Sequence, residues 1–526
     1  MNLIYDAWIP IRRESGKQEL IAPWQLTETD DPVVALNAPR PDFNGALNQF
    51  LIGLLQTAAT PDDGHKWLDW LEEPPSAEML KEYFSQYAYA FELQSEKGSF
   101  MQDFEPLEVT SASNLAELLI DSPGGNTAKL NKDHFVKRGL VERVCPSCVA
   151  TALFSLQINA PAGGQGHRTS LRGGGPLTTL VILDGNSDLP NDLWRTLWLN
   201  VLEQQQVDAL SGDEHKTSST DIFPWLAKTR TSEKNTGTKT TPVDTHPLQM
   251  YWGMPRRIRV LWEQTQSGCC DLCDIESDHL VTHYQTKNYG INYTGAWQHP
   301  LSPYSLNKTG ELLPQHAQPG GLTYQHWLGF FEDSENHFRA AVVKRYRKLA
   351  EQWGEQFRLY AFGYDMDNMK ARCWYEATFP LITIPDDIRF EFAKRVQTLT
   401  ETAAQFAGFI RTCVKEAWFK RPGDAKGDTS FLTQSFYQHT EGAFYQAAKA
   451  LQCQLTDGTD QEVLQEWHKT MRKAALELFD YWAARGDFTQ ANPRRIAAAR
   501  NKLNGLTYSK KIREALQLPR HTREAA

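Results

Sequence analysis

Long apolar runs are missing from this sequence. No stretch approaches the roughly 18 to 20 apolar residues that a helix needs to cross a bilayer, although 41% of the 526 residues are hydrophobic. The N-terminal stretch MNLIYDAWIPIRR is interrupted by Asp6 and Pro10, and it lacks the apolar segment of a secretory signal peptide. We therefore expect a cytoplasmic protein that makes no membrane contact.

An excess of positive charge is absent as well. The chain has 55 Lys and Arg against 64 Asp and Glu, which gives a formal net charge of −9 at pH 7. A protein that binds nucleic acid mainly through its overall electrostatic field is basic. Any contact of this chain with nucleic acid must therefore be local, or must be shared with a partner that supplies positive charge.

Cysteine is scarce, because eight in 526 residues are too few for a disulfide framework. Four of the eight form two CxxC pairs, Cys145 with Cys148 in VCPSC and Cys270 with Cys273 in CDLC. Two such turns can direct four thiolates at one tetrahedral zinc ion. Since sulfur fills every ligand position, no position is left for water, and the predicted role of the zinc is structural.

The same spacing has a second interpretation. A CxxC pair can be redox-active, and buried cysteines can remain free thiols. About 120 residues separate the two pairs, far more than in a compact zinc ribbon. A shared ion would therefore tie distant segments of the chain together.

The length of the chain favours one large domain and a smaller one. Strand-like runs at 177–185, 256–263 and 279–285 alternate with helical patterns, one of which begins after Asp42 as its expected N-cap. This mixture predicts an α+β fold class, with a mixed α/β domain over residues 1–380. Within it, residues 205–247 are polar and show almost no apolar periodicity, so a long exposed loop is expected there.

From about Pro385 onward the apolar residues recur at helical spacing. Four consecutive segments each carry one apolar stripe, and short turn-forming sequences such as RPGDAKGD, TDGTD and RGD separate the first three. Four amphipathic helices with short connections pack best as an antiparallel bundle. We therefore predict a four-helix bundle over residues 385–526.

The stretch APAGGQGHRTSLRGGG, residues 160–175, is rich in glycine. It has no GKS or GKT ending, and no strand-turn-helix pattern supports a dinucleotide site, so both phosphate-binding interpretations are weak. Glycine lets a backbone approach a ligand where a Cβ would clash, and the DNA minor groove is one surface that requires this. A plain flexible loop is the alternative.

A second polar segment is FGYDMDNMKARCW, residues 362–374. Asp365 and Asp367 superficially offer the two carboxylates of a metal-dependent nuclease, but the common spacing of such a site and a companion motif are lacking. A capped loop that enters a helix is another interpretation. We favour a loop that presents polar and apolar side chains outward.

Taken in order, seven motifs resemble one family. They are WIPIR, CPSC followed by ALF, NAP with the glycine loop and SLRGGGPLTTLV, the second CxxC, GAWQHPLSPY, GYDMDNMKARCW and SFYQHTEGAFY. The sequence resembles CasA, the large subunit of the type I-E CRISPR Cascade complex, along nearly its whole length. The resemblance implies a mixed N-terminal domain and a C-terminal four-helix bundle.

The resemblance also implies roles for individual residues. In that family the glycine loop, a lysine of a following hairpin and a later loop read the protospacer-adjacent motif in the minor groove of double-stranded DNA. The matching positions here are Ala162, Gly163, Gly164, Gln165, Gly166, Lys287, Asn288 and Asp367. The wedge that splits the duplex maps to Asn368 and Met369. Some relatives have glutamine at the wedge and glycine where Gln165 stands, so the preferred motif is left open.

The implied partners follow from the same family. They are the other Cascade subunits, the 5′ end of the CRISPR RNA, double-stranded target DNA and a helicase-nuclease that cuts it. The segment 116–144 resembles the loop that docks at the 5′ end of the guide. The leading hypothesis is a non-enzymatic recognition subunit that starts R-loop formation. A zinc-stabilised nuclease that uses Asp365 and Asp367 is the rival, and a protein-binding scaffold is a third possibility.

Overall fold

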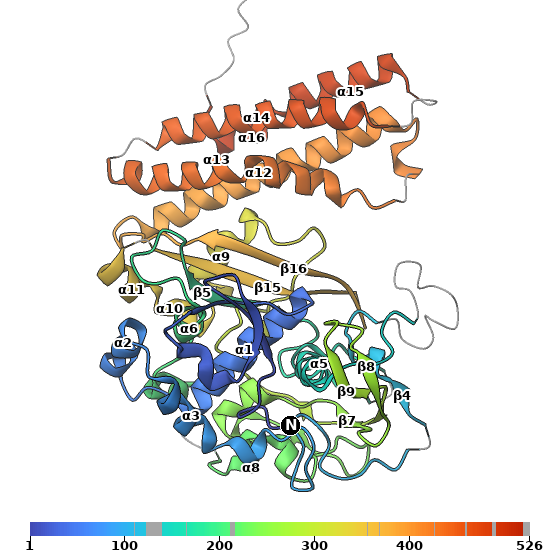
Figure 1. Cartoon of the computed structure of the whole chain (residues 1–526). Helices are drawn as coiled ribbons and strands as arrows, with labels where there is room; N and C mark the ends of the chain where they lie inside the picture. The colour runs from blue at the N-terminus through green and yellow to red at the C-terminus, as the bar shows by residue number, and fades with distance from the viewer. Residues whose placement is uncertain are drawn as a thin grey trace, which may run out of the picture. The chain divides into compact units, whose positions relative to one another are not determined.

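The computed structural model describes residues 1–109, 111–122, 139–164, 166–210, 216–354, 356–367, 369–424, 427–457, 460–486 and 491–518. The chain divides into two units (Figure 1). Unit 1 holds Met1–Ala317 and Asp333–Thr378, and unit 2 holds Gln318–Glu332 and Phe379–Ala526. Among the described residues, no helix is both long enough and apolar enough to span a membrane.

Unit 1 mixes short sheets with helices, so the predicted α+β fold class is confirmed. Its helices are α1 Pro41–Ala58, α2 Gly64–Glu72, α3 Ala77–Ser85, α5 Pro146–Asn159, α6 Leu193–Trp198, α7 Gln204–Ala209, α8 Ser219–Ile222, α10 Ala341–Lys344 and α11 Tyr346–Trp353. Its strands are β1 Ile9–Arg13, β2 Gln18–Ile21, β3 Val33–Leu36, β4 Ser113–Asn114, β5 Thr178–Leu183, β6 Lys239–Thr240, β7 Arg257–Val260, β8 Thr265–Cys269, β9 Glu276–Val281, β10 His283–Lys287, β11 Asn292–Tyr293, β12 Tyr304–Leu306, β13 Leu312–Pro314, β14 His337–Phe338, β15 Phe357–Asp367 and β16 Lys370–Pro380.

Three of the sheets position the candidate site. Strand β15 lies between β5 and β16, and β10 lies between β4 and β7. Strands β8 and β9 form a separate antiparallel pair with a register shift between Gln266 and Gly268. The second CxxC pair follows directly, with Cys270 just after β8. The segment that begins after α5 carries the glycine loop and leads back into β5 (Figure 1).

The core of unit 1 is aromatic. The buried ring of Phe50, in α1, meets five other rings edge-on at centroid distances of 5.1 to 5.9 Å; these belong to Trp8, Phe91, Phe100, Phe154 and Trp252. Edge-to-face pairs are favourable beyond the area that they bury. Many of the tryptophans of this sequence therefore serve the core. Those of unit 1 that are fully buried or nearly so are Trp8, Trp67, Trp194, Trp198, Trp225 and Trp252.

Two local predictions for unit 1 are wrong. Asp42 is not the N-cap of α1, because the helix starts at Pro41 and Asp42 is buried, where it accepts a hydrogen bond of 2.7 Å from the Tyr364 hydroxyl. The segment 205–247 is not one long exposed loop, since it contains α7, α8 and β6 and contributes the fully buried Phe223 and Trp225 to the aromatic core. The reason is a short apolar stretch that contains Phe223 and Trp225, which is buried although the residues around it are polar.

Unit 2 is mainly helical. Its helices are α9 Trp327–Phe331, α12 Arg389–Trp418, α13 Ser430–Asp457, α14 Gln461–Ala483, α15 Pro493–Leu506 and α16 Lys510–Ala515. Helix α12 packs against α13, α14 and α15, which gives the four-helix bundle its centre (Figure 1). The fourth apolar segment of the sequence is divided between α15 and the short α16. The segment Gln318–Glu332, with α9, belongs to this unit although it precedes β15 in the chain.

Tyr324 ties that segment to the bundle. Its buried ring stacks on Phe444 at 4.3 Å, and its hydroxyl lies 2.8 Å from the hydroxyl of Thr440. We expect Tyr324→Phe to lower the free energy of unfolding of unit 2 by about 1 kcal/mol, because one buried hydrogen bond is lost while the ring remains. Urea denaturation of the full chain measures this. The control is Tyr481→Phe, whose ring is 47% exposed; equal stability of the two variants would contradict the expectation.

Candidate functional site

The glycine loop is folded on itself and fastened at its root. The N–H of Gly175 donates to the carbonyl of Asn159 at 3.0 Å, and the N–H of Ser170 donates to Ala160 at 2.9 Å. Nearer the tip, the N–H of His167 donates to Gly164 at 2.9 Å. Gly164 and Gly166 have φ values of 65° and 88°, a backbone region that favours glycine. The described residues of the loop thus form a hydrogen-bonded turn.

The tip of this loop is open to solvent. Ala162, Gly163 and Gly164 are exposed and Gly166 is half-buried, whereas Gln165 lies outside the described residues. Exposed backbone without side chains can approach a ligand closely, which is the property that the minor-groove prediction required.

Two arginines hold the base of the loop through buried or half-buried hydrogen bonds. Arg256 donates to the carbonyl of Pro161, and Arg172, which is fully buried, donates to the neutral oxygens of Gln49, Thr178 and Ser302. Burial lowers the pKa of Arg172 to about 10, so it remains charged near neutral pH. Burial and the nearby Arg256 lower the pKa of His167. At neutral pH the imidazole is therefore uncharged.

The segment 362–374 is a β-hairpin. Strand β15 runs to Asp367 and β16 starts at Lys370, so the interpretation as a loop that enters a helix is wrong. The long alternating pattern of FRLYAFGYDMD continued beyond the quoted motif and was the signal for a strand. Asn368 lies outside the described residues, and Met369 at the hairpin tip is 53% exposed.

The two carboxylates of the nuclease hypothesis both face one arginine. Arg372 makes a bidentate pair with the buried Asp365, at 2.7 and 3.1 Å, and approaches Asp367 at 3.8 Å. A carboxylate held by a guanidinium is a poor ligand for a catalytic cation. Among the described residues, the Cys cluster below is the one group of three or more His, Cys, Asp or Glu side chains that is close enough to hold a metal.

The loop, the end of β10 and the hairpin meet. A Cβ placed on Gly164 would lie 3.9 Å from the sulfur of Met369. The N–H of Tyr289 donates to the carbonyl of Gly166 at 2.9 Å. Lys287 and Asn288, both half-buried, directly precede Tyr289 at the end of β10. Three segments that are far apart in the sequence thus meet here, through Gly164 with Met369 and Gly166 with Tyr289.

Sequence reasoning missed Tyr289 and Arg256 at this surface. Tyr289 is 36% exposed and has a φ of 64°, although it is not glycine. Its ring covers Gly166, where a Cβ would come within 2.7 Å of the ring. Nothing in the local sequence pattern indicates a tyrosine in the left-handed region, so an inspection of the chain alone does not find it.

The two CxxC pairs come together as a cluster of four thiols. Cys145 precedes α5 and Cys148 lies in its first turn, while Cys270 and Cys273 lie in the turn after β8. Their sulfur atoms all lie within 4.8 Å of one another, and Cys145, Cys148 and Cys270 are buried. A zinc ion with four sulfur ligands at about 2.3 Å places the sulfurs about 3.8 Å apart. The donor set and its spacing therefore fit a tetrahedral thiolate site.

Hydrogen bonds within the cluster shift the pKa values of its thiols in opposite directions. Hydrogen bonding with Cys145 raises the pKa of Cys148, whereas hydrogen bonding from Cys145 lowers the pKa of Cys270. The side chain of Asp271 fixes the turn independently, because one of its carboxylate oxygens accepts from the N–H groups of Glu142 and Arg143 at 2.8 and 2.9 Å. A divalent cation would ionise the remaining thiols, so binding would release protons.

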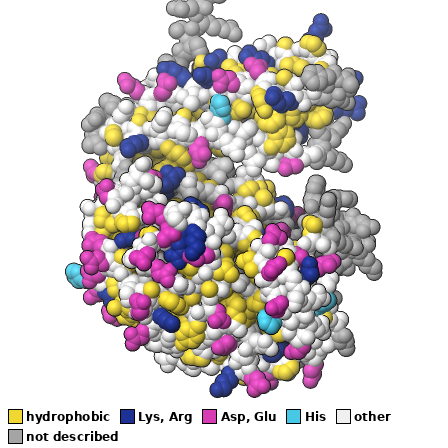
Figure 2. Space-filling view, viewed as in Figure 1, with side chains coloured by type: hydrophobic (Ala, Val, Ile, Leu, Met, Phe, Trp, Pro, Cys, Tyr) yellow, Lys and Arg dark blue, Asp and Glu magenta, His cyan; other side chains and the backbone are white. Residues whose placement is uncertain are grey.

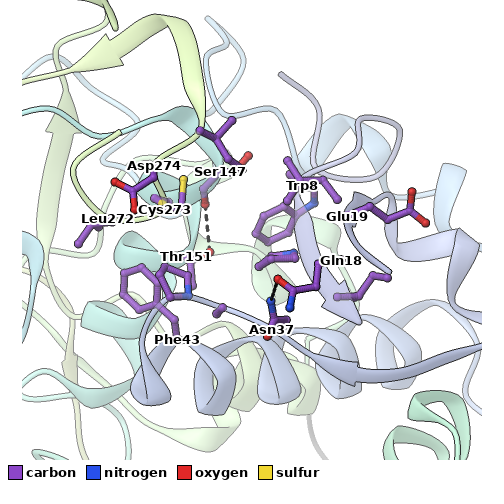
Figure 3. A pocket seen from close by; sticks show the side chains of 17 residues that line it. Trp8, Gln18, Glu19, Asn37, Phe43, Ser147, Thr151, Leu272, Cys273 and Asp274 are labelled. Atoms are coloured by element: carbon purple, nitrogen blue, oxygen red, sulfur yellow. Dashed lines mark hydrogen bonds between the residues drawn. The ribbon is translucent and has the colours of Figure 1, made fainter. Parts of the chain in front are cut away.

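A pocket of about 610 Å³ lies beside the cluster (Figure 3). Trp8 lines it from just before β1, Phe43 from α1 and Thr151 from α5. Cys273 faces it from the other side, next to Asp274. A chelator or thiol reagent can therefore approach the cluster from this pocket.

Positive and negative charges are mixed on one face of the molecule (Figure 2). Figure 2 shows Lys and Arg interspersed with Asp and Glu over the face that it draws. This distribution agrees with the net charge of −9. Any attraction of a nucleic acid to this chain must come from particular segments.

Comparison with known proteins gives one family. The model of the CRISPR-associated protein Cse1 family matches residues 2–478. CasA of Thermus thermophilus is similar in structure, with a TM-score of 0.67 and 16% identity over 96% of this chain and 99% of that one. Cse1 of Thermobifida fusca has a TM-score of 0.66 and 14% identity over 99% of both chains. A chain of a CRISPR RNA-guided surveillance complex has a TM-score of 0.62 and 14% identity, over 97% and 99%.

Proposed function

Because the chain belongs to the CRISPR-associated Cse1 family, we propose that it is the large, non-catalytic subunit of an RNA-guided Cascade surveillance complex in the cytoplasm. Its task in this proposal is to recognise the protospacer-adjacent motif in double-stranded DNA and to open the duplex beside it. One observation carries the proposal above all: the exposed glycine turn, the end of β10 and the hairpin tip meet at one surface, where Gly164 approaches Met369 and Gly166 bonds Tyr289.

The chemistry of this surface fits the minor groove. Bare backbone at Ala162, Gly163 and Gly164 can enter a narrow groove, and Lys287 or Asn288 can donate to base acceptors there. The minor groove distinguishes mainly A·T from G·C pairs. We therefore expect tolerance of several related motifs rather than a requirement for one.

The hairpin tip supplies the wedge. Met369 is an exposed apolar side chain at the tip of the hairpin and follows Asn368 in the sequence. Insertion between base steps costs a few kcal/mol of unstacking, which protein contacts and pairing with the guide RNA can offset. The guide then checks the sequence of the protospacer, while this chain checks the motif.

The zinc prediction becomes part of this proposal. Cys145, Cys148, Cys270 and Cys273 would hold one zinc ion, which supplies a strong tie between α5 and the β8–β9 pair and no catalysis. The proposed partners are the other complex subunits, the 5′ end of the CRISPR RNA, target DNA and a helicase-nuclease. Of the docking segment proposed for the guide, residues 116–144, the part PGGNTAKLN at 123–131 lies outside the described residues.

The deciding experiment reconstitutes the guide-bound complex with and without this chain. Binding is measured for duplexes that share one protospacer and differ in the adjacent trinucleotide. The proposal requires an affinity that rises only with the chain present and varies with the trinucleotide. Magnesium-dependent cleavage by the chain alone, abolished in Asp367→Ala, would establish the nuclease instead. An affinity that does not depend on the trinucleotide would favour the third hypothesis, a protein-binding scaffold.

Asn368→Ala should slow duplex opening. Loss of a wedge side chain that stabilises the first unstacked step by about 1.4 kcal/mol slows opening roughly tenfold. A fluorescent base analogue beside the motif measures the rate in the assembled complex. As a control, a target is used whose two DNA strands do not pair with each other at the first protospacer positions, while the target strand still matches the guide. This duplex is already open beside the motif, so the variant should open it at the wild-type rate. An equal slowing on both targets would contradict a wedge role.

A further inference from the structure

A short basic segment, residues 229–239, projects beside the glycine turn, and its function is so far unassigned. Its sequence is TRTSEKNTGTK, and residues 233–239 are all exposed. The projection is closed by backbone hydrogen bonds, from Gly237 to Glu233 at 2.9 Å and from Thr238 to Thr231 at 2.8 Å. It ends at β6, which pairs with β11. We call residues 229–239 the basic projection; it is an ordered turn with a defined direction.

Ser232 fastens the basic projection to the recognition surface. The buried Ser232 donates its N–H to the carbonyl of Tyr289 at 3.1 Å and its hydroxyl to Gly290 at 2.7 Å. Arg168, which follows the glycine turn, donates to the hydroxyl and the carbonyl of Ser232 at 2.7 and 3.1 Å. Tyr289 also bonds Gly166, so both Tyr289 and Arg168 join the projection to the glycine turn.

Of the three positively charged side chains of the projection, only Arg230 forms an ion pair with a described residue. Arg230 pairs with Asp244 at 3.4 Å. Lys234 and Lys239 form no ion pair with any described residue, and Glu233 is the one acidic side chain within the projection. Two exposed ammonium groups therefore remain available next to a surface that the proposed function assigns to DNA.

We propose that the basic projection binds the phosphate backbone of the duplex that flanks the adjacent motif, through Lys234 and Lys239. This rests on the proposed function. Exposed lysines on a fixed projection hold a duplex in register without reading its sequence. Each phosphate that they neutralise releases condensed counterions, so the contact weakens with salt. Such a contact sets the depth at which the glycine turn meets the groove.

The test uses the reconstituted guide-bound complex and two targets. One duplex extends about a helical turn beyond the motif, and the other ends at the motif. For the extended duplex at physiological salt, K234A/K239A should bind about 10-fold more weakly, and its log–log salt slope should be smaller by about 1 to 2. Its binding to the truncated duplex and its preference among trinucleotides should equal those of the wild type. Glu233→Gln should shift binding of the extended duplex in the opposite direction.

The matched control is K97A/K308A, which removes two exposed lysines of the same unit that also form no ion pair with a described residue. It should bind both duplexes like the wild type. An equal loss of K234A/K239A on both duplexes, or no loss on either, would overturn the proposal. Reduced incorporation of the double variant into the complex would overturn it in favour of an acidic protein partner. Failure of the proposed function itself is distinguishable, because the wild-type complex would then ignore the trinucleotide.

Discussion

Cys270→Ser should remove the zinc and lower the melting temperature of unit 1 by roughly 5 to 10 °C. Cys270 is fully buried and belongs to a cluster whose other members come from both CxxC turns. A serine hydroxyl does not replace a thiolate ligand, and structural zinc contributes about 10 to 16 kcal/mol of apparent binding free energy in small zinc domains. In a large unit whose aromatic core also contributes to stability, we expect only part of this free energy to appear as a change in melting temperature. The metal content, about one zinc per chain in the wild type, should fall close to zero.

The neighbouring residue supplies the control. Cys269 is exposed and stands outside the cluster, so Cys269→Ser should keep both the zinc and the melting temperature. Measuring the metal by elemental analysis and unfolding by calorimetry separates the two variants. A well-folded wild-type preparation without zinc, or a Cys270→Ser variant that retains it, would contradict the four-cysteine site. The redox interpretation would then have to explain the cluster.

The four-cysteine cluster was the part of the candidate site that the sequence indicated most directly. Two CxxC pairs restrict each turn locally, and one shared ion is the simplest reason for both to be present. The bundle was also predictable, because each of its helices carries an apolar stripe whose spacing is a local property. The sequence did not predict that Gln318–Glu332 belongs to unit 2. Tyr324 contacts Phe444 and Thr440, which lie more than 100 positions later, and no local pattern indicates these contacts.

The recognition surface shows the same division. The glycine content predicted a bare backbone, and positive φ values at Gly164 and Gly166 agree with it. The neighbours of the turn depend on tertiary contacts between distant segments. Ser232 stands 64 positions after its partner Arg168, and Tyr289 comes later in the chain. The sequence motifs around Ser232 and Tyr289 do not indicate a function. The polar composition around Ser232 predicted a long exposed loop. In the structure Ser232 is buried, and its hydroxyl bonds both Arg168 and the carbonyl of Gly290.

Gly166→Ala should weaken motif-dependent binding of the assembled complex by about 10- to 100-fold while leaving the fold intact. The φ of 88° at Gly166 costs a residue with a Cβ about 1 to 3 kcal/mol. The added Cβ would also lie 2.7 Å from the Tyr289 ring, so the turn, the ring or both must move. Because the turn lies at the surface, it can relieve this strain by changing its own conformation, which alters recognition but disturbs few core contacts. Stability should therefore change much less than recognition.

Two further variants separate the causes. Gly185→Ala is the control, because no atom lies within 4 Å of its Cβ and its φ is not in the left-handed region; it should bind like the wild type. Combining Gly166→Ala with Tyr289→Ala removes the clash and keeps the backbone strain. Partial recovery of affinity would attribute the loss to the ring, and no recovery would attribute it to the backbone. If Gly166→Ala alone kept the full dependence on the trinucleotide, the turn would not be the element that reads the motif, and the hairpin tip and the end of β10 would have to carry recognition without it.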